Sequence, residues 1–434
     1  MSAYVIAGGH LADGTGAELL IDGGVVRAIG PAVDAGRATR IDADGLLVLA
    51  GLIDLHTHLR QPGGEGAETV RSGSRAAAAG GYTTVHAMPN TDPVADTAGV
   101  VEQVAALGRA AGYVDVRPIG AVTKGLAGQQ LAELATMARS RARVRLFSDD
   151  GNCVADPLLM RRALEYVGVT GGVIAQHAQE PRLTVGAQLH EGAVSAELGL
   201  AGWPAVAEEA IIARDVLLAG ELDARLHVCH VSTAGSTELL RWAKARGVRV
   251  TAEVTPHHLL LTDDAARGYD PRFKVNPPLR TDEDVLALRA ALADGTIDVV
   301  ATDHAPHPAD AKRAEWGAAA NGMVGLESAL SVVQAAMVDT GLTDWADVER
   351  VMSRTPASIG GTAGGTLAVG APADIVLVDP AASRVFGVHD LAGRSTNSPF
   401  LGRTLPGRII ATFFHGVPTV LDGVVQQLPE GEPA

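Results

Sequence analysis

Cysteine is almost absent from this chain, since Cys153 and Cys229 are the only two among its 434 residues. They lie far apart and form no Cys-x-x-Cys pair, so the sequence supports neither a disulfide framework nor a zinc site built from thiolates. So few cysteines are typical of proteins in a reducing compartment. We therefore expect a cytoplasmic protein.

Positive charge and long apolar runs are also scarce. The chain has 35 Lys and Arg against 50 Asp and Glu, for a formal net charge of −15, and this balance offers no basic footprint for nucleic acid or an anionic membrane. No stretch approaches the roughly 18 uncharged apolar residues of a membrane span, and no basic segment leads into an apolar core at the N-terminus. We expect no nucleic-acid or membrane partner, no leader peptide, and a small molecule as the ligand.

The two ends of the chain share one pattern. Short apolar runs separated by Gly or Asp turns fill residues 1–50 and return after residue 360 without an intervening helical period, which is typical of β-hairpins. With 47% hydrophobic residues, the chain has the apolar content of a globular protein. We predict that residues 1–50 and 361–434 together form one small β-sandwich domain.

Residues 51–360 follow a different pattern, in which apolar strands alternate with Ala- and Leu-rich helical stretches. This alternation predicts an α/β fold with a parallel sheet, and eight strands within this length favour a closed (β/α)8 TIM barrel. An open doubly wound sheet is the alternative, but no G-x-G-x-x-G motif follows the first strand. We place the eight strands at 52–58, 83–88, 114–120, 143–148, 172–177, 225–230, 249–254 and 297–303.

Six polar residues stand at the C-terminal ends of five of these strands, which is the catalytic face of such a barrel. Alternate strand residues point to the same side, so His56 and His58 of the first strand can bind one metal ion together. Imidazoles and carboxylates without a thiolate suit zinc, with manganese, cobalt and iron as alternatives. The six candidate ligands are His56, His58, Asp150, His177, His230 and Asp303.

The other histidines give weaker signals. His227 lies on the sixth strand with a parity opposite to that of His230, so we expect it to face the helices. His257 and His258 follow the seventh strand, and for them orientation of a metal ligand and plain loop packing are equally open. His86 on the second strand is a weak candidate. We expect surface or structural roles for His10, His190, His389 and His415.

A series of motifs carries a resemblance. In chain order they are GLIDLHTHLRQPG, TTVHAMPNTDP, FSDDG, IAQHAQE, HVCHVST, EVTPHHL and ATDHAPH. Together they resemble the class I dihydroorotases of the amidohydrolase superfamily over residues 51 to about 360, and the flanking β segments resemble that superfamily's composite β-sandwich. The resemblance implies a zinc-dependent cyclic amidohydrolase that interconverts N-carbamoyl-L-aspartate and L-dihydroorotate in de novo pyrimidine biosynthesis.

Dihydropyrimidinases, hydantoinases and allantoinases are the alternative members of the superfamily. They bridge two metals with a carbamylated lysine at the end of strand four, whereas this chain has only four lysines and carries FSDDG at that place. By the resemblance, Asp150 takes the place of the carbamate, and Asp149 faces away or forms hydrogen bonds. Lys124, after strand three, is the one lysine on the catalytic rim that competes with this assignment.

The resemblance also assigns roles around the metal. The six ligands would hold one or two zinc ions, and Asp303 would carry a proton between the attacking water and the amide nitrogen. Arg60, Asn90 and His307 would bind the substrate carboxylate, for which a guanidinium offers a bidentate fork.

The remaining substrate contacts come from two further segments. Asn276 and the backbone amides from Gly322 through Met323 to Gly325 would contact the substrate ring. The stretch 307–322 is polar and long for a barrel loop, so we expect it to be a mobile cover over the site.

The resemblance brings a competing, structural function. In some organisms a dihydroorotase-like chain that has lost its ligands serves as a scaffold for aspartate transcarbamoylase. All six ligand positions are filled here, which argues against a dead homologue. A complex with aspartate transcarbamoylase and a homodimer both remain open.

Overall fold

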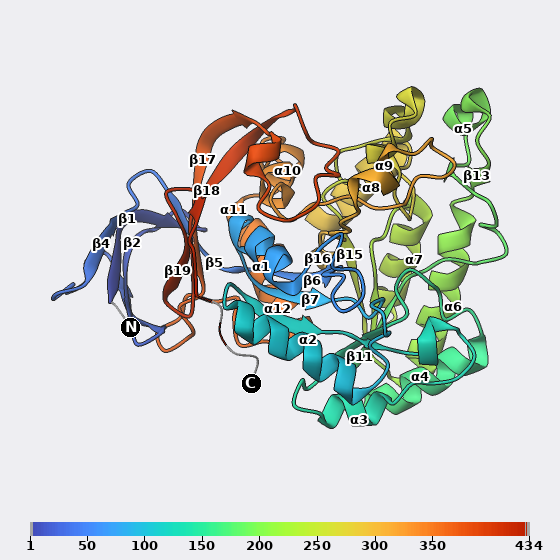
Figure 1. Ribbon diagram of the computed structural model, residues 1–434, viewed down its shortest axis with the longest axis horizontal. Coiled ribbons are helices and arrows are strands. Elements are labelled where there is room, and N and C mark those ends of the chain that lie inside the picture. The colour runs from blue at the N-terminus through green and yellow to red at the C-terminus, as the bar shows by residue number, and fades with distance from the viewer. Residues whose placement is uncertain (1–2, 430, 432–434) are drawn as a thin grey trace.

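Strands from the two ends of the chain pair in one sheet in the computed structural model, which describes residues 3–429 and 431 (Figure 1). The nine strands are β1 (Tyr4–Leu11), β2 (Gly16–Asp22), β3 (Val25–Gly30), β4 (Thr39–Asp42), β5 (Leu47–Ala50), β17 (Ile375–Val385), β18 (Thr404–Phe414), β19 (Val417–Leu421) and β20 (Val424–Val425). Their order is β20-β19-β18-β17-β5-β1-β2-β3, with β4 paired to β1. The two chain ends meet where β17 runs antiparallel to β5.

The terminal sheet forms because its strands bury alternate side chains. In β2, Ala17, Leu19 and Ile21 are buried while their neighbours are partly or fully exposed, which is the two-residue period of a strand with one covered face. Leu19 and Ile21 pack with Val48 and Ile375 in an apolar cluster that joins both chain ends. The terminal sheet therefore has a core of its own.

The middle of the chain contributes parallel strands. One sheet contains β6 (Leu52–Thr57), β7 (Tyr82–Ala87) and β8 (Asp115–Pro118), and another contains β9 (Gly120–Ala121), β10 (Leu146–Ser148), β11 (Val173–Gln176), β14 (Leu226–Val228), β15 (Val250–Val254) and β16 (Val299–Val300). Only Ile119 separates β8 from β9 in the chain. At the other edge, a parallel bridge joins Thr57 to His304, so the segment after β16 lies beside β6.

Each of the eight predicted strands has a counterpart, but three are much shorter than predicted. The strand predicted at 143–148 is reduced to Leu146–Ser148, the one predicted at 225–230 to Leu226–Val228, and the one predicted at 297–303 to Val299–Val300. Arg143 and Asp303 have φ values of 49° and 47°, and this left-handed conformation ends an extended strand. Apolar runs thus located the strands but not their ends.

Helices connect the parallel strands and lie around them (Figure 1). The α8 helix begins with a capping box, in which Thr281 and Asp284 exchange side-chain and backbone hydrogen bonds. The helices are α1 (Val70–Ala79), α2 (Ala98–Ala111), α3 (Leu134–Arg139), α4 (Pro157–Val169), α5 (Ala193–Leu198), α6 (Val206–Leu222), α7 (Ala234–Ala245), α8 (Asp282–Ala293), α9 (Ala309–Arg313), α10 (Ala329–Val333), α11 (Trp345–Glu349) and α12 (Thr355–Gly360).

Short elements complete the fold. The strands β12 (Leu189–His190) and β13 (Gly202–Trp203) form a parallel pair beside the main body. Short helical turns are η1 (Lys124–Leu126), η2 (Asp263–Gly268), η3 (Pro271–Phe273), η4 (Gln334–Val338), η5 (Arg350–Arg354) and η6 (Val388–Asp390). The fold is mixed α/β, as predicted, and none of the helices in the described residues has the length and apolar character that a bilayer crossing requires.

Candidate metal centre and active site

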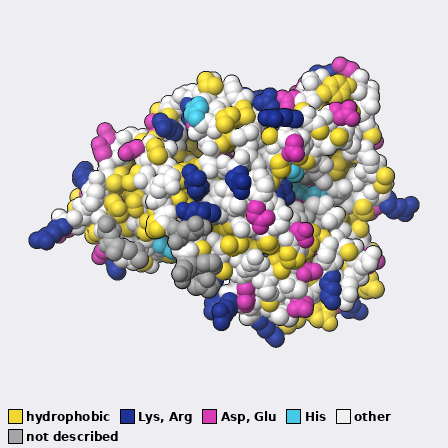
Figure 2. All heavy atoms as spheres, in the orientation of Figure 1, with side chains coloured by type: hydrophobic (Ala, Val, Ile, Leu, Met, Phe, Trp, Pro, Cys, Tyr) yellow, Lys and Arg dark blue, Asp and Glu magenta, His cyan; other side chains and the backbone are white. Residues whose placement is uncertain are grey.

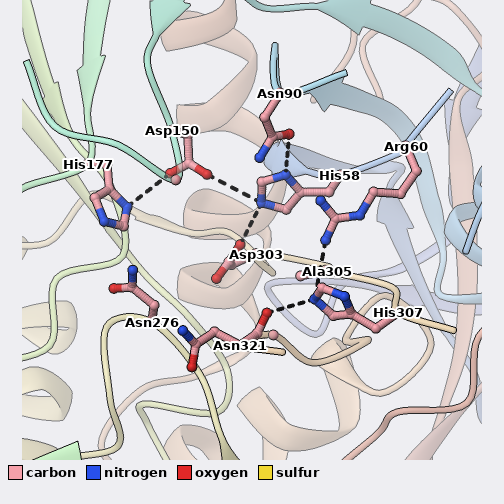
Figure 3. Close-up of a pocket in the computed structure, with 12 residues that line it drawn as sticks. His58, Arg60, Asn90, Asp150, His177, Asn276, Asp303, Ala305, His307 and Asn321 are labelled. Carbon is pink, nitrogen blue, oxygen red and sulfur yellow. Dashed lines mark hydrogen bonds and ion pairs between the residues drawn. The ribbon is translucent and has the colours of Figure 1, made fainter. Parts of the chain in front are cut away.

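A cavity of about 230 Å³ opens where the loops after the parallel strands meet (Figure 3). Its walls carry imidazole, carboxylate, amide and guanidinium groups, and they come from segments spread over most of the chain. The lining residues are His58, Arg60, Asn90, Asp150, Gly151, His177, Asn276, Asp303, Ala305, His307, Asn321 and Gly322.

Two histidines from the end of β6 face two carboxylates at the floor of this cavity. The Nε2 atom of His56 lies 3.4 Å from Oδ1 of both Asp150 and Asp303. The Nε2 atom of His58 lies 3.0 Å from Oδ1 of Asp303 and 3.4 Å from Oδ2 of Asp150. The His-x-His pair and both aspartates therefore converge on one point, although Asp150 and Asp303 come from different loops.

The other two candidate histidines close the same cluster. Nδ1 of His177 lies 2.9 Å from Nε2 of His230, and each of these nitrogens lies 3.3 Å from Oδ1 of Asp150. Asp150 thus stands between both histidine pairs.

The donor set fits a metal ion. Nε2 of His56 is buried, has no hydrogen-bond partner and points between two carboxylates, and a buried polar atom without a partner is costly. The ligand atoms of His56, Asp150 and His230, and those of His56, His58 and Asp303, lie within 4.8 Å of one another. Imidazole nitrogens and carboxylate oxygens at such spacing are able to bind a transition metal.

Both carboxyl groups are held in the ionised form. Burial opposes ionisation of Asp150, but the charge of His56 and hydrogen bonds from His177 and His230 outweigh it, and the pKa lies well below its usual value. Burial also opposes ionisation of Asp303, where a hydrogen bond from His58 and the charge of His56 prevail and lower the pKa. The cluster therefore presents two negative charges at neutral pH.

Glu253 is a site residue that the sequence argument did not identify. Its Oε1 lies 2.6 Å from Nδ1 of His56, which donates to it. Burial would raise the pKa of Glu253, but His56 and His227 lower it strongly. A carboxylate on Nδ1 fixes the ring so that Nε2 faces the cluster. The only signal in the sequence is an acidic residue inside the buried strand β15.

His227 does not face the helices, so that expectation is wrong. Its Nε2 lies 3.0 Å from Oε2 of Glu253, and its Nδ1 lies 2.8 Å from Oγ1 of Thr251. The parity argument assumed an extended chain as far as His230, but β14 ends at Val228 and His230 has a φ of 32°. Alternation of side chains fails across such a turn.

Gln179 is a second residue that sequence reasoning missed. Its Oε1 accepts hydrogen bonds from Nε2 of His177 at 2.7 Å and from Nδ2 of Asn276 at 3.1 Å. This contact leaves Nδ1 of His177 facing Asp150. The place of Gln179, two residues after His177, was its only signal.

Three candidate site residues have backbone conformations that favour glycine. Arg60, His230 and Asp303 have φ values of 60°, 32° and 47°, in a region that costs a non-glycine residue on the order of 1–3 kcal/mol. Such strain is found where function requires a side chain to be aimed. Here Arg60 and Asp303 line the cavity, and His230 contacts Asp150 and His177.

Arg60 and His307 meet at the rim of the cavity (Figure 3). Nε of Arg60 donates to the carbonyl of Pro306, and one terminal nitrogen lies 3.5 Å from Nε2 of His307. That Nε2 carries the ring proton, because it donates to the carbonyl of Asn321 at 2.7 Å. Burial and the charge of Arg60 lower the pKa of His307 to about 3, so the ring is neutral at pH 7.

One of the two candidate amides is hydrogen-bonded to a histidine. Oδ1 of Asn90 lies 2.9 Å from Nδ1 of His58 and accepts a hydrogen bond from it, which turns Nε2 of His58 toward Asp303. Oδ1 of Asn276 is buried in the cavity wall without a hydrogen-bond partner. Both amides therefore line the cavity as expected, and Asn90 also orients His58.

Three of the backbone amides expected to contact the substrate ring are already engaged. The amide of Gly322 donates to the carbonyl of Lys274, that of Val324 to Asn397, and that of Gly325 to Nδ1 of His304. Their contact with the substrate ring therefore stays a prediction. Gly322 does line the cavity, whereas the side chain of Met323 packs in an apolar cluster beside it.

Three neighbouring residues whose roles the sequence left open are all buried. Asp149 accepts hydrogen bonds from the amides of Val122 and Thr123. His258 is held by Thr255 and by the carbonyl of Pro277. His257 is buried with Nε2 unpartnered, and burial lowers its pKa to about 4. The histidines that line no part of the cavity include His10, His86, His190, His389 and His415.

Comparison with known proteins identifies the family of this chain. The sequence fits the family model described as dihydro-orotase-like over residues 45–236. A curated dihydroorotase from Leifsonia xyli subsp. xyli is 68% identical over 424 residues, which cover 97% of each chain. The chain belongs to the dihydroorotase family. A dihydroorotase from Mycobacterium tuberculosis is 54% identical over 95% of this chain and 97% of that relative.

This chain also shares its fold with a hydantoinase. L-hydantoinase (dihydropyrimidinase) from Arthrobacter aurescens superposes on this structure with a TM-score of 0.86, 27% sequence identity and coverage of 98% of each chain. The identity to the two dihydroorotases is at least twice as high. Chemistry at the site, rather than fold, must therefore separate the two activities.

In this member of the dihydroorotase family, each lysine is accounted for away from the metal cluster. Lys124 is exposed in η1. Nζ of Lys244 pairs with Oδ2 of Asp298 at 2.7 Å. Lys274 and Lys312 donate to backbone carbonyls. A carboxylate, Asp150, therefore occupies the centre of the cluster.

Proposed function

We propose that this chain is a zinc-dependent class I dihydroorotase of the amidohydrolase superfamily, which interconverts N-carbamoyl-L-aspartate and L-dihydroorotate in de novo pyrimidine biosynthesis. One observation carries the proposal: the carboxylate of Asp150 lies within 3.4 Å of ring nitrogens from four histidines. High identity to curated dihydroorotases supports the reaction. The two free cysteines support a reducing, cytoplasmic setting.

The proposal extends to the architecture. We propose a closed (β/α)8 barrel over residues 51–360, flanked by a β-sandwich made of residues 1–50 and 361–434. The bridge between Thr57 and His304 supports closure, and the antiparallel pairing of β5 with β17 supports a domain built from both ends.

The residues divide the work of ring opening and closure. His56, His58, Asp150, His177, His230 and Asp303 would hold one or two zinc ions. When bound, zinc supplies Lewis acidity toward the amide carbonyl and the attacking water. Oδ1 of Asp303 faces His58, and we assign Oδ2 the proton that passes from water to the amide nitrogen. In the reverse direction the same oxygen returns it.

The residues at the rim of the cavity are suited to bind the substrate. Arg60 has the bidentate geometry that carboxylates require, and its guanidinium lines the cavity next to Asn90 and His307 (Figure 3). The neutral His307 ring adds a polar contact without a second charge. We propose that these three residues bind the substrate carboxylate and that Asn276 contacts the ring.

Turnover by the purified, metal-loaded chain tests the proposal. We expect interconversion of L-dihydroorotate and N-carbamoyl-L-aspartate, and little or no opening of hydantoin or dihydrouracil, which lack the carboxylate. Activity on those two rings with none on dihydroorotate would favour a hydantoinase. No turnover at all by a zinc-loaded, folded chain would favour the scaffold for aspartate transcarbamoylase.

Replacing Arg60 by Met tests carboxylate recognition. We expect KM for dihydroorotate to rise about 10- to 100-fold, since hydrogen bonds to charged groups contribute roughly 1.5–3 kcal/mol, with a smaller change in kcat. The matched control is Arg408→Met, because Arg408 is exposed on β18 in the terminal sheet. Equal effects of both variants on KM would contradict the assignment.

A further inference from the structure

Two of the four lysines in the chain, Lys274 and Lys312, form hydrogen bonds that involve the segment 307–322. Nζ of Lys274 donates to the backbone carbonyls of Trp316 at 2.6 Å, Gly317 at 3.3 Å and Ala319 at 2.8 Å. An ammonium has three donors, and all three are satisfied by one short stretch of this segment.

Lys312, inside the same segment, points the opposite way. Its Nζ donates to the carbonyls of Pro271 at 2.7 Å, Lys274 at 3.0 Å and Ala320 at 2.8 Å. Both lysines are buried, which is rare for this residue and costly unless every donor is satisfied. Neither pairs with a carboxylate among the described residues. Five of these six hydrogen bonds therefore fasten residues 309–320 to the chain around Lys274, and the sixth, from Lys312 to Ala320, lies within the segment.

The fastened stretch leads directly into the cavity wall. Ala320, held by Lys312, precedes Asn321, whose carbonyl accepts the ring proton of His307 at 2.7 Å. The amide of Gly322 donates to the carbonyl of Lys274 at 3.0 Å. Gly322 has a φ of 133°, and a Cβ there would stand 2.9 Å from Nε2 of His307. The position of His307 thus depends on where the two lysines hold this segment.

We propose that Lys274 and Lys312 are positioning residues that hold residues 307–322 closed over the cavity and thereby place His307 for the substrate carboxylate. Instead of a loosely mobile cover, the segment is a latched one, with Trp316 buried against Leu189 and Ala266. The kinetic part of this inference rests on the proposed function; the structural part does not.

Lys312→Met and Lys274→Met test the latch. Lys274→Met leaves the carbonyls of Trp316, Gly317 and Ala319 without a donor. Lys312→Met leaves the carbonyl of Ala320 without a donor and removes one of the two donors to the carbonyls of Pro271 and Lys274. We therefore expect faster hydrogen exchange in residues 308–322 and a KM for dihydroorotate raised about tenfold, with kcat less affected. The matched control is Lys244→Met, which removes a half-buried lysine that also donates to a carbonyl, that of Gly295, away from the cavity.

The outcomes separate the two proposals. Unchanged exchange in 308–322 in both variants would overturn the latch. A lower melting temperature with unaltered exchange and KM would mean that the lysines contribute only to the overall stability of the fold. This result would also overturn the latch. If dihydroorotate is not turned over by the wild type, the proposed function fails, while the exchange measurement still decides whether the latch exists.

Discussion

Replacing Asp303 by Asn is expected to lower kcat for dihydroorotate by about 10²- to 10⁴-fold, the range contributed by a positioned acid or base. The amide keeps the shape of the side chain but cannot take up a proton. Because Asp303 is held ionised by His58 and His56, the wild-type pH profile should show the limb of a carboxylate base, and the variant should lose it. Steady-state kinetics across pH and metal analysis of each preparation provide the measurement.

The control for this variant is Asp298→Asn. Asp298 precedes β16 and pairs with Lys244 at 2.7 Å, so its loss should cost some stability and leave kcat nearly intact. Should Asp303→Asn retain both metal and near-normal turnover, Asp303 would be a ligand alone. The proton carrier would then be sought at His257 or His307.

Removal of the metal by chelation is expected to abolish turnover, and zinc alone should restore it. Bicarbonate should not matter during reconstitution, because the carboxylate of Asp150 lies among the four histidines and each lysine has other partners or is exposed. Activity of the reconstituted enzyme with and without carbon dioxide, together with the intact mass of the protein, checks this expectation.

Lys124→Met is the control for the bicarbonate result. Lys124 is exposed beyond β9, and the variant should be reconstituted like the wild type. Activity that tracks bicarbonate, or a mass increase that matches a carbamate, would point to Lys124 and revive the hydantoinase alternative.

The positions of the strands followed from sequence because buried parallel strands require apolar runs. The α/β class and the gathering of strand-end residues follow from this pattern alone. His177 and His230 lie 53 residues apart in the chain, yet Nδ1 of His177 lies 2.9 Å from Nε2 of His230. Their role as ligands stays a prediction.

What the sequence did not reveal depends on contacts between distant segments. Glu253 acts through His56, 197 residues away, so neither residue indicates the other locally. His227 was misplaced because the left-handed backbone of His230 breaks the strand period. The hydrogen bond that the amide of Gly322 donates to the carbonyl of Lys274 was also not apparent from the sequence. Each error concerns a backbone turn or a partner that no local pattern reveals.

The sheet made from both chain ends has a consequence for biosynthesis. More than 300 residues lie between Ala50 and its partner Ile375, and at about 5–20 residues per second a ribosome needs roughly 15 seconds to a minute to make them. During that time β5 is an open edge that invites aggregation, so the nascent chain depends on chaperones or on temporary contacts. Completion of the sheet then distinguishes full-length chains from truncated ones, because a chain that terminates before β17 cannot cover the edge of β5.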